Sequence, residues 1–444
     1  MINTQDNGFM FSNKLYLIGL LLIVFFSCNE SKIEQNFVSK DIENFWKTYD
    51  LITQTEDTLL QKEYLQEMFL DKGSPGLESI IKARNYTKAE YINAIKSYPK
   101  YWNSIRSQTL SYKENFSKIE NNIHKLKEVY PNLSPATIYF TFGVFRTNGT
   151  TFGDKVLIGS EMAFADESAI IDELPQWRQP FYADYKPLSN LPLLCTHEYI
   201  HTQQSAIVEQ LIPMCLYEGV AEFISCHATG SPSNSPAIEY GKKNEELIIS
   251  KFIEDIFRPY NNYNWLWGEN RNELKVRDLG YYIGYEISEK YYNKSTDKLL
   301  AIKEMIELDY SNEAEIERIV DDSNFFPKPM EELKKDYENK RPTVLRITEF
   351  ENGSQSVSPK NNSITVYFSE ELDEGYSGLD FGPLGKEYYP KVNNPSRKWG
   401  DKNDSYSFEV DLEADKKYQM AVSGFRSKEG MLLKPFVIDF HTSE

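Results

Sequence analysis

Two histidines four residues apart, with a glutamate directly after the first, are the residues of this sequence best suited to chemistry: His197, Glu198 and His201. On a helix, positions i and i+4 lie on one face one turn apart, so both imidazoles can bind a single zinc ion. The Glu198 carboxylate lies beside the first ligand, where it can take a proton from water on the metal. The spacing therefore predicts a zinc site with its own general base.

A second acidic pair, Glu218 and Glu222, follows with the same one-turn spacing. If the chain turns after the first helix and returns antiparallel, Glu218 can supply the third ligand. Glu222 then lies on the same face and can accept the free ring N–H of a ligating histidine. The alternative is a buried amphipathic helix with both glutamates on a solvated face. The apolar residues around both motifs favour the metal site, because buried ionisable groups need partners or a metal.

Composition predicts a folded protein of two or three domains. The 444 residues are 40% hydrophobic and 14% aromatic, which is more than a disordered chain carries. The net charge is −18. This acidity argues against a nucleic-acid partner and against electrostatic binding to an anionic membrane surface.

The N-terminus predicts export and a lipid anchor. The apolar run Leu15–Phe26 is too short to span a membrane and has the length of a signal-peptide core. It ends in a small residue followed by Cys28, which resembles the lipobox of bacterial lipoproteins. We expect a signal peptide over residues 1–28, a tether over 29–43, and a mature protein held in the cell envelope by lipid on Cys28, facing periplasm or cell surface. An uncleaved signal anchor is the alternative, and it also places the folded part outside the cytoplasmic membrane.

The remaining cysteines, Cys195, Cys215 and Cys226, are odd in number and lie within apolar helical patterns. Their number and spacing do not predict a disulfide framework, so we interpret them as buried free thiols. A cysteine-ligated zinc is the less favoured alternative, because no C-x-x-C spacing occurs.

Periodicity predicts an α+β fold. Residues 44–340 are mainly helical with a small β-sheet, and one long helix is expected over 102–130. The polar segment 166–190 is expected to be a long loop over the site. Residues 341–444 show short alternating runs between turns, which predicts a C-terminal Ig-like β-sandwich domain.

A β-branched and aromatic stretch at 136–145 and the run at 155–159 predict neighbouring strands. A sheet beside a metal helix can pair its edge strand with an extended peptide substrate. The segment Ile158–Met162 is the candidate edge, and Glu161 could bind a substrate amine. The simpler alternative is an exposed glutamate at the end of a strand.

Taken together, these segments resemble a family of predicted zinc-dependent proteases, and gliding-motility-associated lipoproteins are similar as well. More distantly, the metal motif resembles gluzincins such as thermolysin and the aminopeptidase N family. The resemblance covers residues 44–330 and rests on these segments: Ile138–Gly143, Gly149-Thr150-Thr151, Ile158–Met162, His197–His201 and Glu218–Glu222.

The resemblance implies that His197, His201 and Glu218 bind zinc and that Glu198 is the catalytic base. Tyr281, three residues before Gly284, resembles the Tyr-x-x-Gly segment that supplies an oxyanion donor in aminopeptidase N relatives. In a chain with 30 tyrosines, a packing role for Tyr281 is the alternative.

The sequence therefore predicts a lipid-anchored zinc metallopeptidase that hydrolyses a peptide or protein substrate with zinc as its cofactor. The second hypothesis is a non-catalytic envelope lipoprotein, a scaffold or a component of gliding or secretion machinery, that keeps the peptidase fold.

Overall fold

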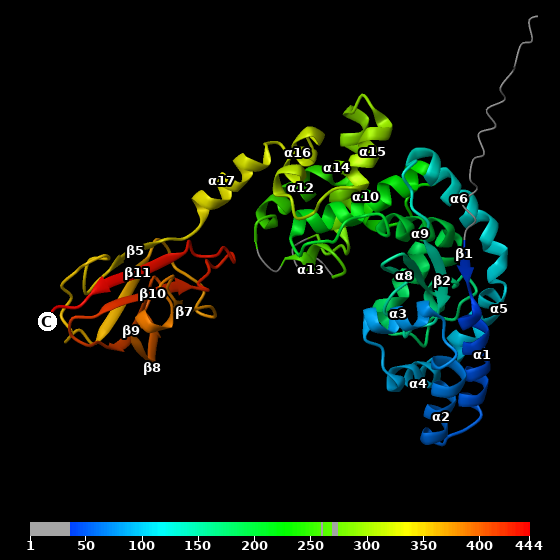
Figure 1. The fold of residues 1–444 in the computed structure, drawn as a ribbon, viewed down its shortest axis with the longest axis horizontal. Helices are drawn as coiled ribbons and strands as arrows, with labels where there is room; N and C mark the ends of the chain where they lie inside the picture. The colour runs from blue at the N-terminus through cyan, green and yellow to red at the C-terminus, as the bar shows by residue number, and fades with distance from the viewer. Residues whose placement is uncertain (1–35, 259–260, 269–273) are drawn as a thin grey trace, which may run out of the picture. The chain divides into compact units, whose positions relative to one another are not determined.

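The computed structural model describes residues 36–258, 261–268 and 274–444. The predicted signal peptide, the predicted lipidation site Cys28 and the first part of the predicted tether lie outside the described residues. Among the residues that are described, no helix is long and apolar enough to cross a membrane. Figure 1 colours the helical part of the chain from blue through green to yellow, and the C-terminal strands from yellow to red.

The N-terminal helices form an aromatic-rich core. Thr87 and Glu90 make a capping box that starts α4, since each side chain bonds to the other residue's backbone N–H. The expected single helix over 102–130 is wrong, because a 3-10 turn, η2, separates α5 from α6. The elements are α1 (Lys40–Thr53), α2 (Thr58–Tyr64), the π-helical η1 (Leu65–Leu70), α3 (Pro75–Arg84), α4 (Lys88–Ser97), α5 (Pro99–Leu110), η2 (Tyr112–Asn115) and α6 (Phe116–Val129).

A four-stranded sheet follows, with strand order β1-β2-β4-β3. Strands β1, β2 and β4 run parallel, and β3 pairs antiparallel with β4. The predicted edge segment Ile158–Met162 is therefore wrong: β4 is an inner strand, and a short helix, α7, begins at Ser160. The edge strand next to the histidine helix is β3. The strands are β1 (Asn36–Val38), β2 (Thr137–Thr141), β3 (Gly149–Phe152) and β4 (Lys155–Gly159).

The segment predicted as a long loop over 166–190 contains α8 and the start of the histidine helix α9, so that expectation is wrong. α10 packs against both α9 and α14 (Figure 1). The helices are α7 (Ser160–Ala163), the 3-10 helix η3 (Gln176–Arg178), α8 (Gln179–Tyr185), α9 (Pro187–His201), α10 (Leu211–Thr229), α11 (Pro236–Lys243), α12 (Glu245–Asp255), α13 (Asn262–Trp265), α14 (Leu279–Lys294), α15 (Lys298–Ile306), α16 (Glu313–Ser323) and α17 (Met330–Lys340).

α10 and α14 approach each other at two glycines. A Cβ atom on Gly284 would lie 1.7 Å from the carbonyl oxygen of Cys215, and one on Gly219 would lie 2.1 Å from the Gly284 carbonyl carbon. Any larger residue at Gly284 would force the two helices apart. This contact holds the N-terminal turn of α14 against α10.

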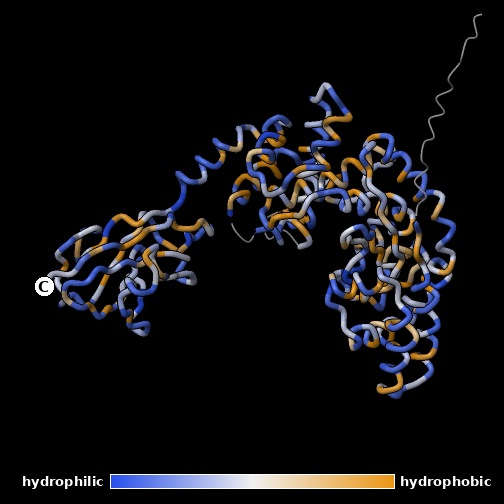
Figure 2. The backbone as a smooth tube through the Cα atoms, in the orientation of Figure 1, coloured by the Kyte–Doolittle hydropathy of each residue, from blue (hydrophilic) through white to orange (hydrophobic). Residues whose placement is uncertain are grey.

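The C-terminal residues form antiparallel sheets with strand orders β11-β10-β7 and β5-β6-β9-β8. Buried apolar side chains from both sheets make one core, and along β6 buried positions alternate with partly exposed ones. Orange and blue alternate along these strands in Figure 2 for the same reason. The elements are β5 (Val344–Ile347), β6 (Ser363–Phe368), β7 (Gly378–Phe381), the 3-10 helix η4 (Lys386–Tyr388), β8 (Lys391–Trp399), β9 (Ser405–Asp411), β10 (Lys417–Ser423) and β11 (Phe436–His441).

The predicted boundary at residue 341 falls between α17 and β5. Residues 35–444 group together as one unit by their contacts. The division into two folded domains therefore stays a prediction.

Candidate metal centre

The two histidines lie in the last turn of α9, an almost entirely buried helix. Pro187 starts it at the first turn, where a missing backbone N–H costs nothing. Apolar residues occupy most positions around the helix, as expected of a helix enclosed by protein. His197 and His201 are only 7% and 8% exposed, so the imidazoles are held within the fold rather than in solvent.

α10 returns alongside α9 and brings Glu218 to the two imidazoles. The Oε2 atom of Glu218 lies 3.4 Å from Nε2 of His197 and 3.3 Å from Nε2 of His201. The two Nε2 atoms are 3.1 Å apart. His197, His201 and Glu218 are thus a group able to hold a metal ion.

These separations match those of tetrahedral ligands around one ion. Bonds of ~2.05 Å at tetrahedral angles place the ligand atoms ~3.3 Å from one another. The three measured distances of 3.1, 3.3 and 3.4 Å bracket that value. The donor set is also chemically suitable, because two imidazoles and one carboxylate are the ligands of many catalytic metal sites.

Both histidines are oriented by partners on their other ring nitrogen. Nδ1 of His197 lies 3.0 Å from Oε2 of Glu222, and the Ser233 hydroxyl donates to the other Glu222 oxygen. Nδ1 of His201 lies 2.6 Å from Oε1 of Gln204. Such outer partners fix the ring orientation of metal-binding histidines.

Gln204 and Tyr217 are residues that the sequence analysis missed. Gln204 is itself held by Tyr310, whose hydroxyl accepts from Nε2 of Gln204 at 2.8 Å. The Tyr217 ring stacks on His201 with 4.3 Å between centroids. A glutamine just beyond the helix and a tyrosine beside Glu218 carry no spacing signal of their own, so only the fold identifies them.

Positive charge at this group is strongly favoured. Burial opposes the charged imidazole of His197, but hydrogen bonds to Glu218 and Glu222 outweigh it and raise the pKa of His197 to about 10. Burial alone would raise the pKa of Glu218, yet the two imidazoles hold that pKa well below its usual range. The surrounding carboxylates therefore create a site that favours a cation.

Glu198 differs from the other glutamates of the site. Among the described residues, no side chain or backbone group hydrogen-bonds to its carboxylate, whereas Glu218 and Glu222 both have partners. Burial raises the pKa of Glu198. A carboxylate with a raised pKa and free oxygens can accept a proton and later release it.

The Glu198 carboxylate lies against the edge strand β3. A Cβ atom on Gly149 would be 2.6 Å from Oε1 of Glu198, so only glycine leaves room for the carboxylate here. The next residue on that face, Thr151, lies near Tyr217. One face of β3 is therefore directed at the metal-binding group.

Tyr281 also lies at this group. Its ring is nearly parallel to that of His197, with 6.4 Å between centroids. Burial and the neighbouring Glu218 carboxylate raise the pKa of the Tyr281 hydroxyl, which keeps it protonated. The glycine contact explains the position, because Gly284 brings α14 close to α10 one turn beyond Tyr281.

Glu161 lies away from these residues, on α7, and is fully buried. Its carboxylate accepts backbone N–H bonds from Gly143 at 2.9 Å and Phe145 at 3.0 Å. This burial lends no support to the predicted contact with a substrate amine. Glu161 instead holds the connection between β2 and β3.

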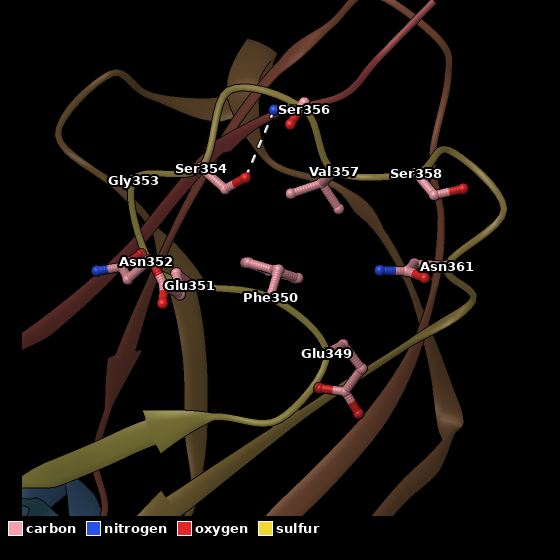
Figure 3. A pocket seen from close by; sticks show the side chains of 10 residues that line it. All are labelled: Glu349, Phe350, Glu351, Asn352, Gly353, Ser354, Ser356, Val357, Ser358 and Asn361. Carbon is pink, nitrogen blue, oxygen red and sulfur yellow. Dashed lines mark hydrogen bonds between the residues drawn. The ribbon is translucent and has the colours of Figure 1, made fainter.

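Cys195, Cys215 and Cys226 are buried free thiols, as predicted. A hollow of about 560 Å³ lies elsewhere, along the connection between β5 and β6, and is lined by residues including Glu349, Asn352 and Val357 (Figure 3). The Glu349 carboxylate accepts the backbone N–H of Thr365 at 2.8 Å. With no group of convergent ligands described there, we assign this hollow no chemistry.

No protein-family model matches this sequence, and no curated protein matches it. Among solved structures, CopC from Methylosinus trichosporium OB3b is 14% identical, covers 23% of this chain and 94% of CopC, and has a TM-score of 0.19. The S-layer protein rSbsC(31-844) is 10% identical over 91% of this chain and 45% of that chain, with a TM-score of 0.18. The catalytic module of the metalloprotease ZmpA from Clostridium perfringens is 12% identical over 91% of this chain and 74% of that chain, with a TM-score of 0.18. TM-scores of this size do not establish a shared fold, so the function has to be inferred from the metal-binding group itself.

Proposed function

We propose that this chain is a zinc-dependent metallopeptidase of the gluzincin-like kind that its two motifs resemble. The observation that carries the proposal is the convergence of His197, His201 and Glu218 at tetrahedral spacing, with the free Glu198 carboxylate beside them. Three protein ligands leave a fourth position open, which distinguishes catalytic zinc sites from structural ones. When bound, zinc would polarise a substrate carbonyl and lower the pKa of a water molecule at the open position.

The residues of the chain would move the protons and orient the groups. Glu198 would take the proton of the attacking water and return it to the leaving amine, which suits its raised pKa. Tyr281, kept protonated, would donate a hydrogen bond to the oxygen that becomes negative during attack. Glu222 and Gln204 would hold the two imidazoles in place.

The edge of β3 would bind the substrate as an added strand. The Asn148 carbonyl accepts the Gly159 N–H, so its backbone faces β4. Because backbone groups alternate along an antiparallel pair, those of Gly149 and Thr151 face outward. The Thr147 hydroxyl donates to the Gly149 carbonyl. No bond from the described residues to the Gly149 N–H or to the Thr151 backbone groups is seen, so these groups can pair with a peptide.

We further propose that lipid on Cys28 anchors the chain in the bacterial cell envelope, and that residues 341–444 are an Ig-like domain. The apolar N-terminal run and the small residue before Cys28 support the first point. The two antiparallel sheets around one apolar core support the second.

The test is cleavage of a broad peptide library by the purified full chain, together with its zinc content by elemental analysis. Glu198→Gln should lower kcat by about 10²- to 10⁴-fold, the usual contribution of a general acid–base group, without loss of zinc. Glu286→Gln is the matched control, because Glu286 is another buried glutamate and lies near Lys242 instead of the histidines.

Zinc-bound protein that cleaves no peptide would contradict the enzyme and favour a non-catalytic envelope scaffold. Equal activity in wild type and Glu198→Gln would contradict the role of Glu198 as base.

A further inference from the structure

Arg84, at the C-terminal end of α3, lies on the opposite face of β3 from the metal-binding group. Its Nη2 donates to the hydroxyl of Thr150 at 2.9 Å and to that of Thr147 at 3.3 Å. Side chains alternate between the faces of a strand, so Thr150 points to α3 while Gly149 and Thr151 point to α9 and α10. Arg84 is thus fixed at the edge where a substrate strand would pair.

Thr150, whose hydroxyl accepts from Arg84, directly follows Gly149, against which the Glu198 carboxylate lies. The Gly149 backbone connects the two regions. It adjoins Glu198 on one side, and its carbonyl accepts from Thr147, which in turn bonds to Arg84. A peptide lying along β3 would therefore meet Arg84 close to the bond that is cleaved.

The guanidinium of Arg84 has donors to spare. It is exposed, and in the described part of the chain no carboxylate pairs with it and only its Nη2 makes hydrogen bonds. The neighbouring cations differ: Arg146 pairs with Glu90 at 3.3 Å, and Lys82 lies over the Phe152 ring. The chain has a net charge of −18, yet no described carboxylate neutralises this arginine at the edge strand.

We propose that Arg84 recognises a carboxylate of the substrate, so that the enzyme prefers peptides with a negative charge beside the cleaved bond. This inference rests on the proposed peptidase function. A substrate residue paired opposite Thr150 projects its side chain to the same face as Thr150, where Arg84 lies. With Nη2 occupied by the two threonine hydroxyls, the Nε and Nη1 groups of Arg84 are left to donate charge-assisted hydrogen bonds to a substrate carboxylate.

The carboxylate could be an Asp or Glu side chain or the C-terminus of a short peptide, and the substrates separate these sources. One quenched fluorescent peptide is varied by exchanging Asp and Glu for Asn and Gln at each position around the cleaved bond. Each peptide is made with a free and with an amidated C-terminus, and kcat/KM is measured with the zinc-loaded full chain.

We expect the charged peptide to be preferred by about 10- to 100-fold, the range for a hydrogen bond to a charged group. Arg84→Gln should abolish this preference while neutral peptides change less than about threefold. Arg84→Lys should keep part of it, and Arg84→Glu should reverse it towards Lys-bearing peptides. Arg146→Gln and Lys82→Gln are the charge-matched controls and should keep the preference.

Binding separates the failure of this inference from that of the peptidase proposal. Affinity of the same peptides for zinc-loaded Glu198→Gln, with and without Arg84→Gln, is measured by fluorescence anisotropy. If the wild type cleaves no peptide but acidic peptides still bind more tightly than neutral ones, and Arg84→Gln removes that difference, only the peptidase proposal is contradicted. Equal binding of acidic and neutral peptides, or an unchanged preference in Arg84→Gln, would overturn the inference and leave Arg84 as a link between α3 and β3.

Discussion

The helical part and the C-terminal strands bury different kinds of side chain. The helical part buries ionisable residues that include Glu161, His197, Glu198, His201 and Glu218. Within residues 344–444 the buried polar residues are Ser405, Gln419, Ser427 and Thr442, none of which carries a charge at neutral pH.

This difference distinguishes the part of the chain that contains the candidate site from the part that does not. Burying an ionisable group without partners costs several kcal/mol, so a packed protein without a need for such groups excludes them. The C-terminal strands do so, and their shared core is apolar. The helical part instead gives its buried charges defined neighbours, and at the metal-binding group the Glu198 carboxylate has no hydrogen bond among the described residues.

The largest expected effect comes from Gly284→Ala, which disrupts the contact between α10 and α14 that positions Tyr281. The added Cβ would lie 1.7 Å from the Cys215 carbonyl oxygen, so α10 and α14 must move apart. We expect a loss of about 3 kcal/mol or more in the free energy of unfolding, measured by urea titration, and weaker zinc binding.

Gly375→Ala in the C-terminal strands is the control, since its Cβ would meet only the flexible Asp373 side chain at 3.2 Å. It should change the free energy of unfolding by less than about 0.5 kcal/mol. Equal stability of the two variants would contradict the close-packing argument.

The next largest effect is the pH dependence of the free energy of unfolding that Glu161 gives to the helical part. Burial raises its pKa from 4.5 to about 7, despite the backbone hydrogen bonds from Gly143 and Phe145. The folded state therefore holds the proton more tightly, and the stabilisation is complete below pH 4.5 and lost as the pH rises through 7. At ~1.4 kcal/mol per pH unit, the free energy of unfolding should fall by about 3 kcal/mol across this range.

Urea unfolding of the wild type and of Glu161→Gln at pH 5 and pH 8 measures this effect. The NH₂ group of the Gln amide would face one of the two backbone N–H groups, which leaves two donors without an acceptor. The variant should therefore be less stable at both pH values, and its free energy of unfolding should change less between them. An equal pH dependence in the two proteins would show that Glu161 does not titrate in this range.

A smaller effect is expected for Glu222→Ala, which removes the partner of His197. The change leaves the imidazole Nδ1 and the Ser233 hydroxyl without their acceptor. Loss of such an outer partner lowers metal affinity by about 10- to 100-fold, which competition with a zinc chelator can measure. Glu222→Gln keeps an acceptor and should lose less, so equal losses would contradict the orienting role.

The smallest effect is expected for Ile438→Val, which tests whether the C-terminal strands are separate from the chemistry. Ile438 is fully buried in their apolar core. Removal of one methyl group should cost about 0.5 to 1.5 kcal/mol of stability. Zinc content and peptide cleavage should stay at wild-type values, and a change in either would show that the two regions are coupled.

The residues of the metal-binding group could be predicted because their arrangement is almost local. A separation of four residues on a helix places His197 next to His201, and the same rule places Glu218 next to Glu222. The remaining assumption was that the helix with Glu218 returns alongside the helix with the two histidines. The apolar character of both helices made burial, and hence a partner for each charge, the expected outcome.

The strand edge could not be predicted in this way. The run around Ile158 has the pattern of a strand, but strand order depends on pairings between distant segments, which periodicity does not contain. The structure places β4 inside the sheet and β3 at its edge. The assignment of Glu161 as a residue at the end of an edge strand failed for the same reason, because that carboxylate turns inward to backbone N–H groups.

The sequence by itself determined the chemistry of the ligands, the helices that carry them and the change from helices to short strands near residue 341. Tertiary structure alone decided which strand faces Glu198, that Gln204 orients His201, and that Arg84 bonds to the other face of that strand. The physical reason is range: helix periodicity acts within a few residues, whereas sheet order and side-chain partners depend on how distant segments pack.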